Sequence, residues 1–279
     1  MNKNPVASFL LPDEFRRPPL VRMLHEGRVV GEASRHAVRG LSGARTRTPY
    51  AGSAPARDAD PVLLVPGFMA GDYTLAGLSR QLRREGHRTY RAGIPVANMG
   101  CTLDTAEMIE SRLEAIVARR EQRVQIVGHS LGGMLARGIA ARRPDLVSGI
   151  VTMGSPVLAP GAHHRSLTMF VLGLVAMSKV GVSGVMNETC VGGECALESF
   201  QESQVPLPSD VSFTAIYSRN DGIVDWRACL DPAATHVEVR ASHIGMAVDP
   251  RVSDEVLSAL RTHREGAAAA ASSLRVATA

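Results

Sequence analysis

Residues 124–133 read Val124-Gln125-Ile126-Val127-Gly128-His129-Ser130-Leu131-Gly132-Gly133, and the architecture of the chain can be worked out from them. The first four residues predict a buried strand, and Leu131–Arg142 predicts a helix directly after the turn. A G-x-S-x-G pattern between a strand and a helix is typical of a nucleophile elbow, a sharp turn that presents a reactive serine. A phosphate-binding loop would need a Lys after the glycines, and none follows. A glycine-rich turn without chemistry is the alternative.

The small residues around Ser130 explain why this turn is expected. Gly128 and Gly132 lack a Cβ atom, so the strand and the helix can approach each other closely at the bend. The bend holds Ser130 in a strained backbone conformation and lifts its hydroxyl clear of the sheet. The N-terminus of the next helix then lies beneath the hydroxyl, where backbone N–H groups and the helix dipole favour developing negative charge.

Strands and helices are predicted to alternate on both sides of this turn. Such alternation implies right-handed crossovers and a mostly parallel sheet flanked by helices, an α/β fold. The predicted strands are residues 62–65, 87–91, 124–127, 150–153, 211–217 and 237–239, and the predicted helices are residues 75–85, 105–120, 131–142 and 252–263.

A serine hydroxyl needs a base and a carboxylate to become an effective nucleophile. His243 lies between the last predicted strand and the final helix, where the base is expected. Asp221 follows the preceding strand and stands before a Gly in a turn, and Asp225 competes with it for the role of the acid. His129 lies inside the elbow, and we expect its side chain to point away from the site of attack.

An oxyanion formed at a substrate carbonyl needs two N–H donors. The first candidate is the N–H of Leu131, the residue after the serine. The second is expected in the loop after the first strand, where Gly67 lets the backbone approach. The Phe68 N–H is the best candidate there, and the Met69 N–H is the next. An ordinary Pro-Gly turn is the alternative reading of this loop.

The alternation breaks over residues 157–208, and we interpret this insertion as a lid packed over the site. Its apolar run, residues 167–186, has the length of a membrane span, about 20 residues. Lys179 and two glycines inside the run argue against a span. Met69 and Phe170 are expected to bind substrate in a hydrophobic pocket that suits a medium or long acyl chain. Packing of the lid onto the core is the alternative.

The two ends of the chain differ in composition from its body. Residues 1–60 carry ten Lys and Arg against six Asp and Glu, which accounts for the whole net charge of +4. We interpret residues 1–59 as a solvated basic arm and linker, with a helix over 21–38. Residues 266–279 are rich in Ala and Ser and predict a disordered tail. The catalytic domain is expected to span residues 60–265.

Composition and cysteine usage narrow the remaining options. The 279 residues, 45% of them hydrophobic, are enough for a sizeable core and exclude global disorder. The cysteines at 101, 190, 195 and 229 form no C-x-x-C pair, which argues against a zinc ribbon or a redox motif. A disulfide between Cys190 and Cys195 stays open. We expect no metal and no organic cofactor, and the lack of a signal-peptide pattern predicts a cytoplasmic protein.

Four segments together resemble the α/β-hydrolase superfamily, and within it the bacterial lipases and esterases. They are residues 62–69, 127–133, 218–226 and 242–246. Two features depart from the family pattern. Many lipases have His-Gly where this chain has Pro-Gly at residues 66–67. The usual first two strands have no counterpart in residues 1–59, so six strands are expected rather than eight.

The resemblance implies an acyl-enzyme on Ser130, with Asp221 and His243 completing a triad in the superfamily's order. The chain is therefore interpreted as a serine hydrolase that cleaves a small-molecule or lipid ester and makes transient contact with a membrane or lipid interface. A thioesterase or acyltransferase with the same triad and an inactive hydrolase-fold binding module are the alternatives. Nucleic acid is not an expected partner, because aromatic residues make up only 4% of the chain.

Overall fold

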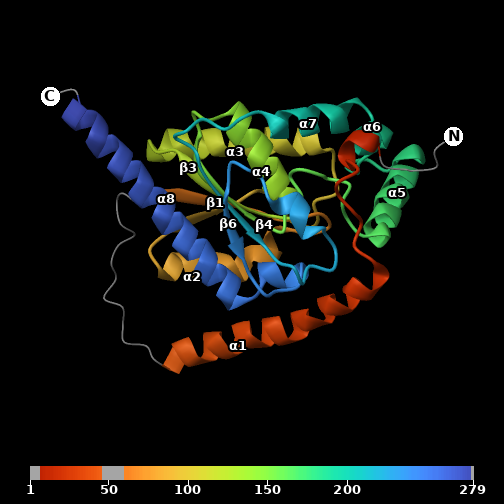
Figure 1. Cartoon of the computed structure of the whole chain (residues 1–279), viewed down its shortest axis with the longest axis horizontal. Coiled ribbons are helices and arrows are strands. Elements are labelled where there is room, and N and C mark those ends of the chain that lie inside the picture. The colour runs from red at the N-terminus through yellow and green to blue at the C-terminus, as the bar shows by residue number, and fades with distance from the viewer. Residues whose placement is uncertain (1–6, 46–59, 278–279) are drawn as a thin grey trace.

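The computed structural model describes residues 7–45 and 60–277 of the chain. Its centre is a six-stranded sheet in the order β2-β1-β3-β4-β5-β6, in which every neighbouring pair runs parallel (Figure 1). The expected α/β fold is confirmed, and so is a sheet of six strands. The strands are β1 (Pro61–Val65), β2 (Arg88–Arg91), β3 (Val124–His129), β4 (Val147–Met153), β5 (Ser212–Tyr217) and β6 (Thr235–Glu238).

The central strands explain the apolar runs of the sequence. β1 and β3 are buried at every residue, because helices cover both faces of the sheet. β6 lies at one edge and is largely exposed. Since all strands run parallel, their carboxyl ends share one edge, and the loops after β1, β3, β5 and β6 meet there.

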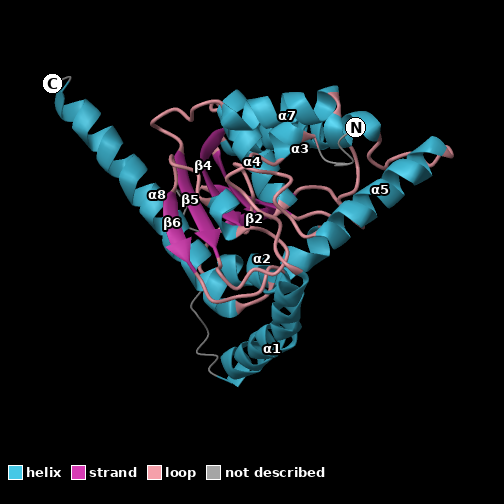
Figure 2. Ribbon diagram, turned by 45° about the vertical axis from the view of Figure 1, so that its right-hand side comes forward, coloured by secondary structure: helices cyan, strands magenta, loops and turns pink. Residues whose placement is uncertain are grey.

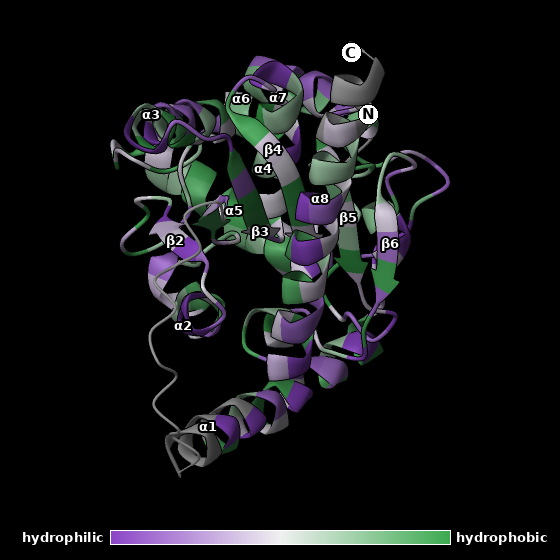
Figure 3. Cartoon of the chain, turned by 90° about the vertical axis from the view of Figure 1, so that its left-hand side faces the viewer, coloured by the Kyte–Doolittle hydropathy of each residue, from purple (hydrophilic) through white to green (hydrophobic). Residues whose placement is uncertain are grey.

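Two helices pack on each face of the sheet. α3 (Thr102–Arg120) and α4 (Leu131–Arg142) cover one face, and α2 (Ala76–Arg84) and α8 (Pro250–Ala277) cover the other. Figure 3 shows hydrophobic colour along the central strands and hydrophilic colour on the outer sides of these helices. The helical side chains in the two cores include Ile109, Leu113, Ile116, Leu135 and Ile139 on one face, and Leu78, Leu82, Val252, Val256 and Leu260 on the other.

The insertion between β4 and β5 forms three helices. These are α5 (Arg165–Lys179), α6 (Glu188–Gly192) and α7 (Glu194–Gln204). α7 packs on α4, whereas α5 projects from the body (Figure 2). Among the described residues, no helix is long and apolar enough to cross a membrane.

The N-terminal arm packs against the body, which differs from the solvated arm expected. It contains a short 3-10 turn, η1 (Ser8–Leu10), then a longer one, η2 (Leu20–Arg28), which leads into α1 (Val29–Arg45). Figure 1 shows α1 running along one side of the body, where it lies beside the beginning of α8. Two arm carboxylates, Glu26 and Glu32, are buried. A charged segment is expected to be solvated only when its charged groups have no partners in the fold. Here the two carboxylates accept hydrogen bonds from backbone N–H groups about 200 residues away, so they can be buried.

The C-terminal end also differs from the sequence prediction. Residues 266–279 were expected to be disordered, but α8 continues through Ala277. Alanine has the highest helix propensity of all residues, so a low-complexity alanine run can extend a helix already anchored by packing. Two short 3-10 turns lie between β5 and α8, namely η4 (Trp226–Cys229) and η5 (Ile244–Ala247), and a third, η3 (Asp72–Leu75), precedes α2.

Candidate active site

Ser130 occupies the turn between β3 and α4 in a strained backbone conformation. Its φ is 51° and its ψ is −119°, a region that residues with a Cβ atom rarely adopt. The neighbouring glycines make the turn sterically feasible. A Cβ on Gly128 would overlap the Gly132 carbonyl group, and a Cβ on Gly132 would overlap the carbonyl of Val65. The structure thus has the elbow geometry that the sequence predicts around Ser130.

His243 and Asp221 form a buried hydrogen-bonded pair. The His243 Nδ1 lies 2.6 Å from Asp221 Oδ2, and both side chains are almost fully buried. The other carboxylate oxygen, Oδ1, accepts hydrogen bonds from the backbone N–H groups of Ile223 and Val224, at 2.9 and 2.7 Å. Asp221 is thus fixed from two sides, and its orientation toward the imidazole is set by the turn after β5.

Asp225, the competing acid, has a different place. Its carboxylate caps the 3-10 turn η4 by accepting a hydrogen bond from the Arg227 N–H, and it also forms an ion pair with the Arg227 guanidinium. It accepts a further hydrogen bond from the backbone N–H of Arg16. The structure therefore brings Asp221, and not Asp225, to the histidine.

The electrostatic surroundings of His243 favour its protonated form. Burial opposes a charged imidazolium, but the negative charge of Asp221, its hydrogen bond and the charge of Glu26 outweigh burial and raise the pKa of His243. Because Nδ1 faces the carboxylate, it carries the proton in the neutral ring, and Nε2 is left as the basic nitrogen.

The Ser130 turn and the His243 loop are joined through His129. The His129 Nε2–H donates to the backbone oxygen of His243 at 3.0 Å, and the two ring centroids are 5.0 Å apart. Burial lowers the pKa of His129 to about 4, so the ring is neutral at pH 7. The prediction that His129 points away from the site was incomplete, since its ring holds the backbone of His243 directly beside the elbow.

Within the described residues, the Ser130 hydroxyl makes no hydrogen bond to the His243 ring. Catalytic hydrogen bonds are often long or poorly aligned before a substrate binds, so this looser arrangement suits a free enzyme. Ser130 follows β3 and His243 follows β6, so both stand at the carboxyl edge of the parallel sheet, and the hydrogen bond from His129 to the His243 backbone joins their loops.

The two expected oxyanion donors lie beside the serine. Ser130, Leu131 and Phe68 line one cavity. The Met69 N–H donates to the carbonyl oxygen of Asn98 at 3.0 Å, so it is already used. The Phe68 N–H has no acceptor in the described part of the chain, and Leu131 is the first residue of α4, whose N–H has no partner within the helix. This pattern favours Phe68 over Met69 as the second donor.

An apolar cavity of about 150 Å³ opens at Ser130. Its wall comes from the loop after β1, from α4 and from the insertion. Met69 and Phe170, the expected substrate-binding residues, do not line it, and both are exposed, at 43% and 56%. Helix α5 turns a different stripe toward the cavity, which explains why Phe170 points outward. The insertion residues in the wall include Leu167, Val171, Met186, Val191, Ala196 and Phe200.

Glu26 is the main functional candidate that the sequence did not indicate. One of its carboxylate oxygens accepts from the N–H groups of both Gly222 and His243 at 2.9 Å, and the other accepts from the Ile244 N–H at 3.0 Å. A single arm carboxylate therefore ties the turn that carries Asp221 to the turn that carries His243.

Glu32 holds the same loop one residue earlier. Its carboxylate accepts from the Ser242 N–H at 3.0 Å and from the Ser242 hydroxyl at 2.6 Å. Gly245 leaves the space that this carboxylate occupies, because a Cβ at that position would overlap the Glu32 side chain. The Glu32 carboxylate thus fills a space that the His243 loop leaves open beside Gly245.

Comparison with known proteins agrees with this architecture. Residues 60–178 match the family described as alpha/beta hydrolase fold. The parallel sheet order and the elbow after β3 agree with this match, so the chain has the α/β-hydrolase fold.

The chain is more particularly similar to bacterial triacylglycerol lipases. It is 32% identical to one of Vibrio cholerae over 113 residues, which cover 38% of this chain and 33% of that protein. It is 26% identical to one of Pseudarthrobacter phenanthrenivorans over 215 residues, which cover 68% of this chain and 65% of that protein. The chain thus spans less than two thirds of the length of these relatives.

Solved structures show the same fold. A lipase of Bacillus licheniformis in its mature form matches with a TM-score of 0.59 at 14% identity, covering 75% of this chain and 94% of that one. A metagenomic carboxyl esterase matches with a TM-score of 0.56 at 16% identity, covering 77% of each chain. At these identities the likeness is one of fold.

Replacing Glu26 by Gln should lower the pKa of His243. The change keeps the shape of the side chain but removes a negative charge that favours the imidazolium. NMR titration of the His243 ring measures the effect. In the wild type we expect a pKa above the usual value of about 6.5 for histidine, and in Glu26→Gln a lower one. Glu14→Gln, an exposed change in the same arm, is the control, and an unchanged or higher pKa in Glu26→Gln would contradict the assignment.

Replacing Glu32 by Ala should destabilise the fold by about 1–3 kcal/mol, because the N–H and hydroxyl of Ser242 lose a buried acceptor. Urea unfolding followed by circular dichroism measures the free energy. Glu14→Ala, on the exposed surface of the arm, should stay within about 0.5 kcal/mol of the wild type. Equal effects of the two changes would show that the arm does not brace the His243 loop.

Proposed function

We propose that this protein hydrolyses carboxylic esters through a covalent acyl intermediate on Ser130. The observation that carries the proposal is the buried Asp221–His243 pair, held beside a serine in a strained strand-to-helix turn. The similarity to bacterial proteins named triacylglycerol lipase supports the same reaction class. In this interpretation, residues 60–265 form the catalytic domain, and residues 157–208 form a lid over its cavity.

The first half of the reaction forms the acyl-enzyme. Ser130 Oγ attacks the ester carbonyl carbon while His243 Nε2 takes the hydroxyl proton, and the carbonyl π electrons move onto oxygen. Asp221 keeps the ring in the required tautomer and stabilises the imidazolium. The N–H groups of Phe68 and Leu131 stabilise the oxyanion. The oxyanion then collapses, the bond to the alkoxy oxygen breaks, and His243 returns its proton to the leaving alcohol.

The second half uses the same groups with water as the nucleophile. His243 Nε2 takes a proton from water as its oxygen attacks the acyl carbon, and the same two N–H groups stabilise the second oxyanion. Collapse breaks the bond to Ser130 Oγ, which regains its proton from His243. The acid product leaves, and no net electron transfer occurs.

The cavity supports an acyl chain as the part of the substrate that it binds. Its lining is mostly apolar and begins at Ser130, so an acyl chain can enter while the carbonyl stays at the oxyanion donors. The outer side of the insertion has a different use. Met169, Phe170 and Val180 are exposed there, at 68%, 56% and 80%, which supports transient contact with a lipid substrate at its interface with water.

Replacing Ser130 by Ala should reduce kcat/KM for a chromogenic ester by roughly 10⁴-fold or more and abolish labelling by a fluorophosphonate probe. Asp221→Asn should cost on the order of 10⁴-fold in kcat, because the imidazole would take the wrong tautomer. Asp225→Asn is the matched control and should retain most of the activity, since that carboxylate faces Arg227 and the arm. Equal losses at the two aspartates would contradict the assigned acid, and a wild type that the probe does not label would contradict hydrolysis.

Filling the cavity should shorten the acyl chain that the enzyme accepts. Ala196 is buried and lines the cavity, so Ala196→Leu should lower kcat/KM for long-chain p-nitrophenyl esters by about tenfold or more, with acetate ester little affected. Glu198→Leu, on the exposed side of the same helix, is the control. A wild type with the same activity on all chain lengths, or equal profiles for the two variants, would contradict acyl binding in this cavity.

A further inference from the structure

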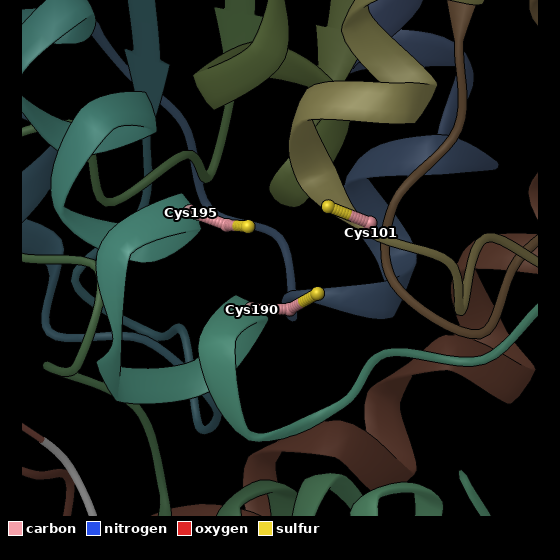
Figure 4. A group of neighbouring side chains, drawn as sticks. All are labelled: Cys101, Cys190 and Cys195. Carbon is pink, nitrogen blue, oxygen red and sulfur yellow. The ribbon is translucent and has the colours of Figure 1, made fainter.

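Three cysteines, one of them about 90 residues before the other two, converge beside the cavity. The Sγ atoms of Cys101, Cys190 and Cys195 all lie within 4.8 Å of one another. Figure 4 shows the three sulfur atoms pointing into the same space from three different segments. Cys101 caps the N-terminus of α3, Cys190 lies in α6 and Cys195 lies in the first turn of α7. All are free thiols.

The number of sulfur atoms and their spacing distinguish between the chemistries open to such a cluster. A disulfide joins two sulfurs at about 2.05 Å and would leave the third unused. Thiolates around one cation have metal–sulfur distances of about 2.3 Å, which puts neighbouring sulfurs about 3.8 Å apart in a tetrahedral site. The observed cluster needs a contraction of at most about 1 Å to reach that geometry. Unlike a disulfide, a bound cation would use all three sulfur atoms.

We propose that Cys101, Cys190 and Cys195 form a binding site for a thiophilic d¹⁰ cation, Zn²⁺ or Cu⁺, with the three thiolates as ligands. Cu⁺ is satisfied by three sulfurs, whereas Zn²⁺ takes a fourth ligand, which water can supply. The proposal does not depend on ester hydrolysis.

The backbone N–H groups of Leu103 and Asp104, in the first turn of α3, face the Cys101 sulfur. The Thr189 hydroxyl lies 3.4 Å from Cys195 Sγ, and the Cys190 thiol donates to Asn187 Oδ1 at 3.3 Å, a hydrogen bond that is lost when Cys190 gives up its proton to bind a cation. Polar atoms of this kind commonly orient the ligands of a metal site.

Binding is an exchange of protons for a cation. Each sulfur–metal bond replaces one S–H bond, so a cation bound by three thiols releases up to three protons to solvent. Oxidation states do not change.

A bound cation would link the insertion to the body. Cys101 begins a helix that packs on the sheet, whereas Cys190 and Cys195 belong to the inserted helices, and Cys190 also lines the cavity. The site would therefore hold one wall of the cavity in place. Because the cation binds the folded chain, it should also raise the temperature of thermal unfolding, by an amount that grows with the logarithm of its free concentration.

The test is metal binding by the full-length, reduced protein freed of metal with a chelator. Zn²⁺ is titrated against a chromophoric zinc chelator and Cu⁺ against a copper(I) chelator, with proton release followed by a pH indicator. Co²⁺ serves as a spectroscopic probe, because thiolate-to-cobalt charge-transfer absorption reports the number of sulfur ligands. We expect one cation per chain, and at least about a 100-fold loss of affinity when any one of the three cysteines is replaced by Ser.

Cys229→Ala is the matched control, because Cys229 is a buried thiol outside the cluster, and it should bind as the wild type does. Cys195 is only half-buried, so Cys195→Ser keeps the test decisive if Cys190→Ser fails to fold. The proposal is overturned if the folded, reduced wild type binds neither cation stoichiometrically, or if the three Ser variants bind as tightly as the control. A Cys101–Cys190 disulfide in protein purified without reductant, with no cation bound after reduction, would also overturn it and assign the cluster to thiol oxidation.

Discussion

The Glu26 carboxylate fixes the relation between the two loops that carry Asp221 and His243. Its oxygens accept three backbone N–H groups from these loops, so the separation of the loops is set by one rigid group. The carboxylate comes from the N-terminal arm, outside the parallel sheet. A buried carboxylate would be costly without donors, and the loops supply them, so arm and loops stabilise each other only when both are in place.

Backbone constraints decide the other half of the site. Ser130 has a positive φ because the strand and the helix pack closely at the bend. The neighbouring glycines make this close packing possible, since they have no Cβ atom. His129 then connects this turn to the loop after β6 through one hydrogen bond to the backbone oxygen of His243. The serine turn and the histidine loop are thus positioned by different parts of the chain that meet at a single contact.

The sequence was informative where the interactions that matter are local. The strand runs, the helix periods and the elbow all depend on neighbours a few residues apart, and the six strands and the elbow around Ser130 appear where the patterns predict them. The arm was misjudged because its partners are distant. Nothing in the residues around Glu26 separates it from the exposed Glu14, since only the folded loops about 200 residues later offer it N–H donors. The prediction that Phe170 lines the cavity was wrong for a related reason. The sequence of an apolar helix does not indicate which of its sides faces the cavity.

The same difference between local and distant interactions applies to the cysteines. A search for paired spacings finds no metal motif, because Cys101 is separated from Cys190 by the whole of β3, α4, β4 and α5. The sheet brings the start of α3 to the edge where the insertion folds back, and the three sulfurs meet there. The insertion has no strand of its own among the described residues to order it. Its position over the cavity therefore depends on packing of α7 against α4 and on whatever joins α6 to the body, and a thiolate-bound cation would act at that second junction.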